Sequence, residues 1–126
     1  MSSTGPTLEA LYAAGHWLIE QDRPRQAISL FRTMLLVDAR DERGWLALAT
    51  CHEKLDEPEK AIALCQLALD ACDGKAVRCT IARARLHKAR GERDDALAAY
   101  DEAARIAESL DDRDLTALIA SEAVVS

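Results

Sequence analysis

The sequence has few aromatic residues and no long apolar run. Aromatic side chains make up 4% of its 126 residues although 49% are hydrophobic, so alanine, leucine and isoleucine must build most of the core. This composition suits closely packed helices better than a β-sheet, which favours aromatic and β-branched residues. No stretch approaches the roughly 18 apolar residues of a membrane span, and residues 1–7 lack the basic and apolar regions of a signal peptide. We therefore expect a helical protein without membrane insertion.

Positive charge is also scarce. The 16 lysines and arginines are outnumbered by 22 acidic residues, and the net charge is −6. A nucleic-acid-binding protein needs a basic surface, so we expect a protein partner and no nucleic acid. The cysteines, Cys51, Cys65, Cys72 and Cys79, form no C-x-x-C pair. They are predicted to be reduced thiols inside the helices of a cytoplasmic protein.

Sequence motifs of catalysis are missing as well. The chain contains no glycine-rich phosphate loop, no H-E-x-x-H and no G-x-S-x-G. His52 is predicted to approach Cys65 across a helical hairpin, and a Cys–His pair can act as a nucleophile or bind a metal. No third ligand or orienting acid has suitable spacing. We therefore expect no catalytic residue, no metal site and no cofactor.

What the sequence does contain is a pattern that occurs three times. The alanines Ala27, Ala61 and Ala96 recur at an interval of 34 and then of 35 positions. Pro24 and Pro58 recur at the same interval of 34, each at the start of a predicted helix, where proline is tolerated. A period of about 34 residues with two helices per unit is typical of the tetratricopeptide repeat (TPR). The predicted fold is all-α, a TPR superhelix of three helical hairpins with a C-terminal capping helix.

The repeat pattern divides the chain into segments. Residues 1–7 are predicted to be a flexible lead-in, and 111–126 a capping helix and tail. The three repeat units are expected at about 8–41, 42–75 and 76–110, with helices near 8–20, 24–37, 42–54, 58–71, 76–90 and 93–108. The final helix would cover the open end of the stacked repeats.

In this architecture the first helices of successive units line a concave groove. Position in the repeat predicts these groove residues: Tyr12, His16, Ile19, Leu46, Thr50, Glu53, Arg78, Ile81, Arg85 and Lys88. The groove would be aromatic and apolar at one end and basic at the other. The basic end suits a carboxylate or an acidic segment, although an ordinary solvated helix face explains the same charges equally well.

Trp17 falls outside both the groove and the packing positions of its hairpin. An exposed tryptophan is unusual unless a partner covers it. We expect Trp17 to lie on a self-association or partner surface, with a homodimer as one form of that association. The alternative is that it packs on residues 1–7.

Several short stretches carry a resemblance to a more specific family. They are Leu8-Glu9-Ala10-Leu11-Tyr12, Phe31, Leu36-Val37-Asp38, Asp41, Arg43, Leu46-Ala47-Leu48 and Cys51. With the third unit and the end helix, they make residues 8–109 similar to the TPR chaperones of type III secretion translocator proteins.

The resemblance implies a cytoplasmic bacterial chaperone that keeps a hydrophobic translocator soluble before export. It would bind an extended segment of that protein in the concave groove. Carried over by position, Tyr12 lines an anchor pocket with Leu46 beside it, and His16 and Ile19 replace residues that are aromatic in the family.

Two other functions remain open from the sequence. One is a general TPR adaptor or scaffold subunit in a larger assembly. The other is an adaptor that clamps the C-terminal carboxylate of heat-shock chaperones. That clamp needs lysine and asparagine where this chain has Tyr12, His16 and Thr50, so the sequence disfavours it.

Overall fold

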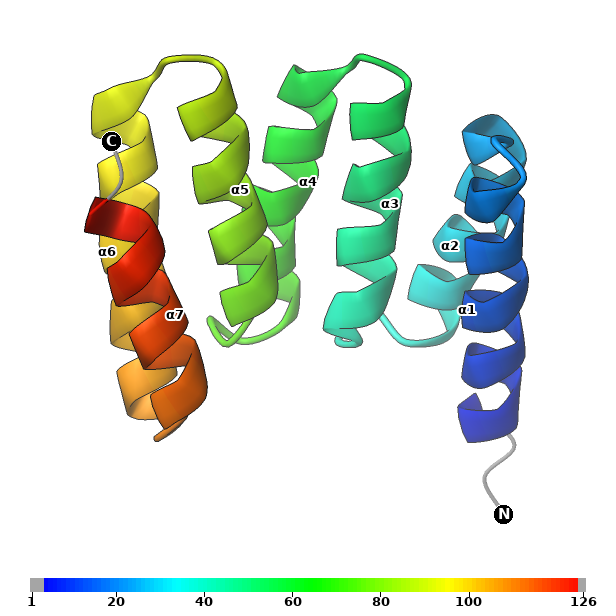
Figure 1. The fold of residues 1–126 in the computed structure, drawn as a ribbon. Coiled ribbons are helices and arrows are strands. Elements are labelled where there is room, and N and C mark those ends of the chain that lie inside the picture. Colours follow the sequence, from blue (N-terminus) through cyan, green and yellow to red (C-terminus); the bar gives the residue numbers. More distant parts are fainter. Residues whose placement is uncertain (1–3, 125–126) are drawn as a thin grey trace. The chain divides into compact units, whose positions relative to one another are not determined.

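The computed structural model describes the backbone of residues 4–124 and the side chains of residues 7–124, and every regular element in that range is an α-helix (Figure 1). The helices are α1 (Thr4–Glu20), α2 (Pro24–Val37), α3 (Glu42–Lys54), α4 (Pro58–Ala71), α5 (Val77–Ala89), α6 (Arg93–Ser109) and α7 (Arg113–Val124). The prediction of an all-α fold of helical hairpins with a C-terminal helix is confirmed. None of the described helices combines the length and apolar character needed to cross a bilayer.

Helix α1 begins earlier than the sequence predicts. It starts at Thr4 rather than Leu8, so residues 4–7 are helical and the predicted flexible lead-in is wrong for them. Pro6 is compatible with this start because the first turn of a helix has no intrahelical acceptor for its N–H groups. Residues 1–3 of the predicted lead-in lie outside the described residues.

Tight turns join the two helices of each hairpin. At equivalent positions Asp22, Asp56 and Gly91 have φ angles of 59°, 59° and 75°, in the left-handed region that glycine and aspartate tolerate better than most residues. Gly74, which follows the end of α4, also adopts this conformation, with φ of 74°. The turns are therefore specified by local sequence.

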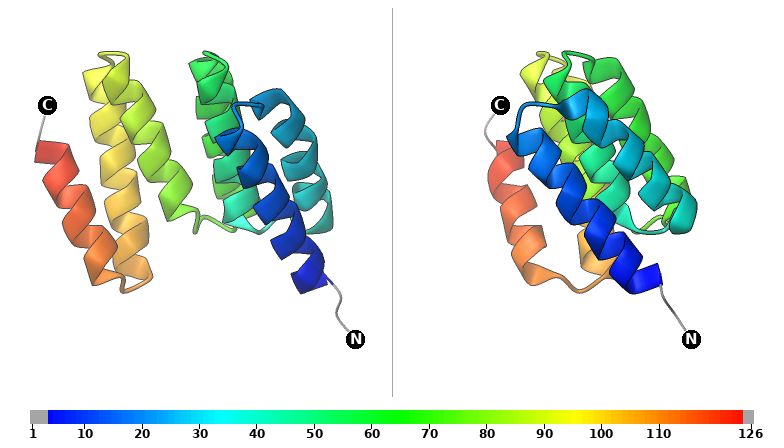
Figure 2. Two further views of the ribbon diagram at one scale, coloured as in Figure 1. Left: turned by 45° about the vertical axis from the view of Figure 1, so that its right-hand side comes forward. Right: turned by 90° about the vertical axis from the view of Figure 1, so that its right-hand side faces the viewer.

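The chain divides into two compact units, Met1–Leu64 and Cys65–Ser126, with the boundary inside α4. In the first unit α1 and α2 pack side by side, and α3 packs against α2 (Figure 2). In the second unit α5 and α6 form the corresponding pair, and α7 packs against α6. Each unit thus contains a hairpin followed by a third helix.

The core of the first unit is built around one aromatic ring. Phe31 is fully buried, among residues that include Met34, Ala27 and Leu48. A Cβ atom on Gly15 would lie only 2.4 Å from Cζ of Phe31. Glycine is therefore needed at position 15, because the ring of α2 occupies the space that a side chain on α1 would take.

The second unit uses a different pair at the same repeat positions. Tyr100 takes the place of Phe31, and Ala84 takes that of Gly15; both are buried. Leu115 and Ile119 of α7 join the same cluster, so the predicted capping helix contributes to the core of this unit. Its N-terminus is stabilised by Asp112, whose Oδ1 accepts a hydrogen bond from the Leu115 N–H at 3.0 Å.

Candidate peptide-binding surfaces

The predicted groove residues of α1 lie on one helix face in the first unit. Tyr12, His16 and Ile19 are spaced by four and three positions, which places them in one row, and all three are half-buried. The rings of Tyr12 and His16 meet edge to face with centroids 4.4 Å apart, and His16 in turn contacts Phe31 at 5.8 Å. The row therefore rests on the core but keeps part of its surface exposed.

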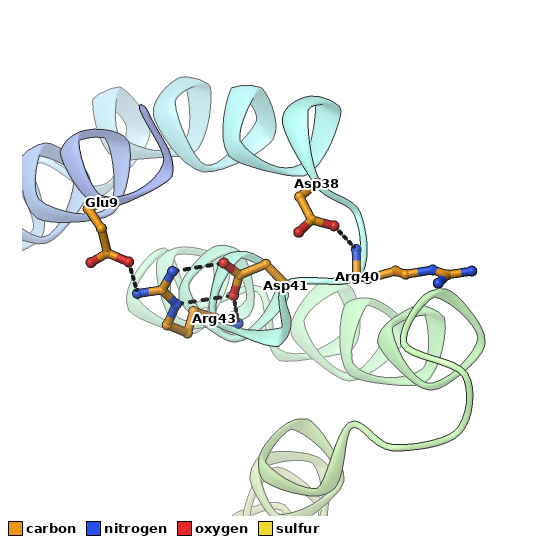
Figure 3. A network of polar contacts seen from close by, with 5 residues as sticks. All are labelled: Glu9, Asp38, Arg40, Asp41 and Arg43. Atoms are coloured by element: carbon orange, nitrogen blue, oxygen red, sulfur yellow. Dashed lines mark hydrogen bonds and ion pairs between the residues drawn. The ribbon is translucent and has the colours of Figure 1, made fainter. Parts of the chain in front are cut away.

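Arg43 holds this aromatic row from the third helix of the unit. Its guanidinium carbon lies 4.8 Å from the centre of the Tyr12 ring, a cation–π distance. The same guanidinium contacts Glu9 at 2.8 Å and Asp41 at 2.8 Å (Figure 3). Arg43 thus connects α1 to the start of α3, and the orientation of Tyr12 depends on it.

The charges around Arg43 reinforce one another. Its side-chain hydrogen bonds hold the pKa of the Asp41 carboxyl below its usual range and raise the pKa of Arg43 itself. Asp41 also caps α3, because its Oδ1 accepts a hydrogen bond from the Arg43 N–H at 3.1 Å. Next to it, Asp38 accepts from the N–H of Arg40 at 3.0 Å (Figure 3). The contact of Arg43 with Tyr12 was not predicted, since nothing in the local sequence relates positions 12 and 43.

The predicted groove residues of α3 form a mainly apolar face. Leu46 and Thr50 are half-buried, whereas Glu53 is exposed. The Thr50 hydroxyl donates a hydrogen bond to the Leu46 carbonyl oxygen at 3.0 Å. Because that hydroxyl is already used within the helix, Thr50 presents mainly its methyl group.

In the second unit the predicted groove residues of α5 divide into two groups. Arg78, Arg85 and Lys88 are exposed, as a basic surface requires. Ile81, in contrast, is only 3% exposed and belongs to the core cluster that includes Ile119 of α7. The structure therefore corrects the assignment of Ile81 to the groove, because its side chain is buried in the core cluster that α5, α6 and α7 share.

Helix α7 also neutralises part of the basic end that was predicted for the groove. Arg85 Nε donates to Glu122 Oε1 at 3.0 Å and to Oε2 at 3.2 Å, and Lys88 Nζ donates to the Glu122 backbone oxygen at 3.3 Å. The bond from Arg85, and less strongly one from the Tyr100 hydroxyl, lowers the pKa of Glu122. Glu122 of the chain itself therefore occupies part of the surface that was predicted to bind a carboxylate of a partner.

Two histidines at equivalent repeat positions bind glutamates rather than a cysteine. His52 Nδ1 lies 3.0 Å from Glu57 Oε1, and His87 Nδ1 lies 2.9 Å from Glu92 Oε1. In both turns the histidine hydrogen bond is the main cause of a lowered glutamate pKa. The signal was present in the sequence as H-x-x-x-x-E, which recurs one repeat later. The pairs close two hairpin turns and have a structural role.

The chemistry available to the remaining reactive groups is limited. All four cysteines are buried thiols outside any disulfide, and burial raises the pKa of the Cys51 thiol to about 11, which leaves little of its reactive thiolate near neutral pH. Potential metal ligands of His87, Glu92 and Asp95 lie within 4.8 Å of one another. However, Arg90 Nε donates to Glu92 at 3.1 Å. This positive charge opposes a metal ion, so we interpret the group as part of the turn.

Trp17 lies on the surface of the first unit with 56% of its area exposed. It is not part of the aromatic row of Tyr12 and His16. Part of the alternative, packing on residues 1–7, lies outside the described residues. Self-association through Trp17 therefore remains a prediction.

Comparison with known sequences identifies the repeat. The sequence model of the family described as "Tetratricopeptide repeat" matches residues 12–76, just over half of the chain. No curated protein sequence matches the chain.

Comparison with solved structures extends the likeness to nearly the whole chain. The type III secretion translocator chaperone SycD of Yersinia enterocolitica has a TM-score of 0.83 and 20% identity, over 97% of this chain and 91% of SycD. PcrH, in complex with the chaperone binding region of PopD, has a TM-score of 0.75 and 24% identity, over 98% and 91%; PcrH comes from Pseudomonas aeruginosa. The TPR2AB domain of yeast Sti1, in complex with pHSP90, has a TM-score of 0.80 and 23% identity, over 94% and 46%. At these identities the likeness is one of fold.

Proposed function

Since the chain belongs to the tetratricopeptide repeat family, we propose that it is a type III secretion chaperone. It binds an extended apolar segment of a secreted translocator-type protein and keeps that protein soluble and export-competent. It acts in the bacterial cytoplasm as a binding protein and not as an enzyme.

One observation carries the proposal, namely that the likeness to translocator chaperones covers nearly all of both chains. The match to SycD extends over 97% of this chain and 91% of SycD, and the PcrH match is a complex with part of a translocator. The equally similar Sti1 domain, by comparison, is covered for only 46% of its length. The fold of the chaperones is thus matched over nearly their full length, whereas less than half of the Sti1 domain is matched.

The side chains of the first unit support an apolar ligand. Tyr12, Ile19 and Leu46 are half-buried on α1 and α3, so each is anchored in the unit and retains surface for a partner. A peptide that covers such side chains gains roughly 25 cal/mol for every Å² of apolar surface removed from water. Tyr12 is held in place by Arg43 before any ligand binds, which reduces the entropy that binding costs.

The test measures binding of the full-length chain to fluorescent, overlapping peptides from the translocator-type proteins encoded in the same genome. Leu46→Glu is expected to weaken the best-binding peptide at least about tenfold, because it places a charge in an apolar contact. The matched control is Leu36→Glu on α2, where the leucine is 87% exposed. Circular dichroism of both variants tests whether they stay helical.

Two results contradict the proposal. The first is that no translocator peptide binds, while a C-terminal peptide of a heat-shock chaperone or another assembly subunit does, which identifies a general adaptor. The second is that Leu46→Glu and Leu36→Glu weaken peptide binding equally, which excludes the α3 face as the contact.

A further inference from the structure

A cavity of about 280 Å³ lies within the second unit, among α5, α6 and α7. Its lining includes the apolar side chains of Ala96, Leu97 and Ala123, the ring of Tyr100 and the cations Lys88 and Arg93. None of the described residues that line it is acidic. Pockets for drug-sized ligands have volumes of about 300 Å³ or more, so this cavity suits a single large side chain.

Small residues leave this space open. Ala96 of α6 and Ala123 of α7 contribute only methyl groups to its lining. Leu97 is consequently 37% exposed although it is apolar and lies on a helix of the hairpin. Burying that surface under a ligand side chain is favourable in water.

Neither cation of the cavity forms an ion pair with a carboxylate of residues 7–124, although Lys88 lies near enough to Glu122 for its charge to help lower the pKa of that carboxyl. Arg93 has no hydrogen-bond or ion-pair partner among residues 7–124, and the hydrogen bond of Lys88 goes to a backbone oxygen of Glu122 at 3.3 Å. The Glu122 carboxylate is itself occupied by Arg85 and the Tyr100 hydroxyl. In a chain of net charge −6, this cavity is a local site for an external anion.

Comparison of the repeats shows that the fold does not require these cations. The position of Lys88 is held by Ile19 in the first repeat and by Glu53 in the second, and the position of Arg93 is proline in both. The hairpins form equally well with those residues. The positive charge is therefore specific to the third hairpin, where the cavity lies.

We propose that this cavity binds one aliphatic side chain of a partner peptide whose neighbouring residue carries a carboxylate. The side chain occupies the space between Leu97, Tyr100 and Ala123, and the carboxylate pairs with Lys88 and Arg93. The inference deepens the proposed function and rests on it, because it assigns a second contact, with an acidic-aliphatic part, to the same partner protein.

The test is an NMR titration of the isotopically labelled full-length chain with acetyl-Leu-Glu-amide. We expect saturable shifts in the amide signals of Leu97 and Ala123. Acetyl-Leu-Gln-amide should bind about three- to tenfold more weakly, because it lacks the charge. Acetyl-Ser-Glu-amide should also bind more weakly, because it lacks the aliphatic side chain.

Matched variants locate the contact. Arg93→Glu should remove the preference for the glutamate peptide, whereas Arg113→Glu should retain it; both arginines are the first residue of a helix, so the effect on the helix dipole is the same. Ala123→Leu fills the cavity without changing charge and should reduce the affinity for both leucine peptides. Heteronuclear spectra of each variant report whether the second unit stays folded.

The proposal is overturned if the glutamate and glutamine peptides bind alike, if Arg113→Glu acts as Arg93→Glu does, or if the shifts fall outside the cavity. Because the dipeptides are tested without a translocator, the result is separate from the Leu46→Glu experiment. Translocator peptides that bind while the dipeptides leave Leu97 and Ala123 unchanged refute this site alone. Saturable dipeptide binding at the cavity with no translocator binding refutes the proposed function, and with it the assignment of a translocator to this site.

Discussion

The two units of the chain each join a hairpin to a third helix by an Arg–Glu ion pair, but the partners are reversed. In the first unit the arginine is on the third helix, where Arg43 contacts Glu9 of α1 at 2.8 Å. In the second unit the arginine is on the first helix, where Arg85 contacts Glu122 of α7. A hairpin and the helix that follows it can thus be joined by an arginine on either side.

The centres of the two hairpins differ in a related way. The first unit combines a phenylalanine with a glycine, Phe31 against Gly15, and extends the ring contacts to His16 and Tyr12. The second combines Tyr100 with Ala84, and its ring ends in a hydroxyl bonded to Glu122. One unit therefore relies on aromatic packing where the other combines packing with a polar network.

The largest expected effect is that of Phe31→Ala. It removes a fully buried ring and should lower the free energy of unfolding by about 3–5 kcal/mol. Tyr100→Phe keeps the ring and loses only the hydrogen bond to Glu122, so it should cost about 1 kcal/mol. Urea unfolding followed by circular dichroism measures both, and a smaller loss for Phe31→Ala than for Tyr100→Phe would contradict the difference between the units.

A second, smaller effect tests the coupling of Gly15 to Phe31. Gly15→Ala places a methyl group 2.4 Å from Cζ of the fully buried Phe31 ring and should cost about 1–3 kcal/mol through overpacking. The double variant Gly15→Ala/Phe31→Leu should lose less stability than the sum of the losses of the two single variants, since the shorter leucine makes room for the new methyl group. Strictly additive losses would show that the ring does not restrict position 15.

The equivalent change in the second unit is the control for that prediction. Ala84→Gly introduces glycine where the chain has alanine, and it should cost about 1 kcal/mol from helix propensity alone. Glycine is thus expected to stabilise one unit and destabilise the other at the same repeat position. The same urea unfolding experiment compares the two.

The smallest expected effect concerns the ion pair of the second unit and its dependence on pH. The pKa of Glu122 is lowered in the folded chain, mainly by Arg85, so its contribution is present above the ordinary glutamate pKa of about 4.3 and is lost as pH falls through the folded value. Glu122→Gln should therefore lower the free energy of unfolding by about 0.2–1 kcal/mol at neutral pH, and this difference from the unchanged chain should vanish in acid, below the folded pKa. Urea unfolding of both proteins at neutral and at acidic pH measures the difference, and an equal loss in acid would contradict the prediction.

The sequence determined those features that depend on neighbours in the chain. Apolar spacing and the repeat interval of Ala27, Ala61 and Ala96 predicted the helices. The helical start at Thr4 was missed because Gly5-Pro6 resembles a loop, although a first turn accepts both. Local propensity and turn chemistry act within a few residues, so one sequence can reveal them.

Only the tertiary structure decided which side chains of the candidate surfaces remain available. Ile81 occupies a repeat position that the spacing assigns to the groove, yet its side chain is buried in the core cluster of the second unit. Arg43 holds Tyr12, and Glu122 holds Arg85, although the members of each pair are far apart in the sequence. The cavity beside Lys88 and Arg93 is lined by residues of both α6 and α7, which are distant in the sequence. Periodicity specifies which face of a helix a residue occupies, but contacts, ion pairs and cavities depend on what packs against that face.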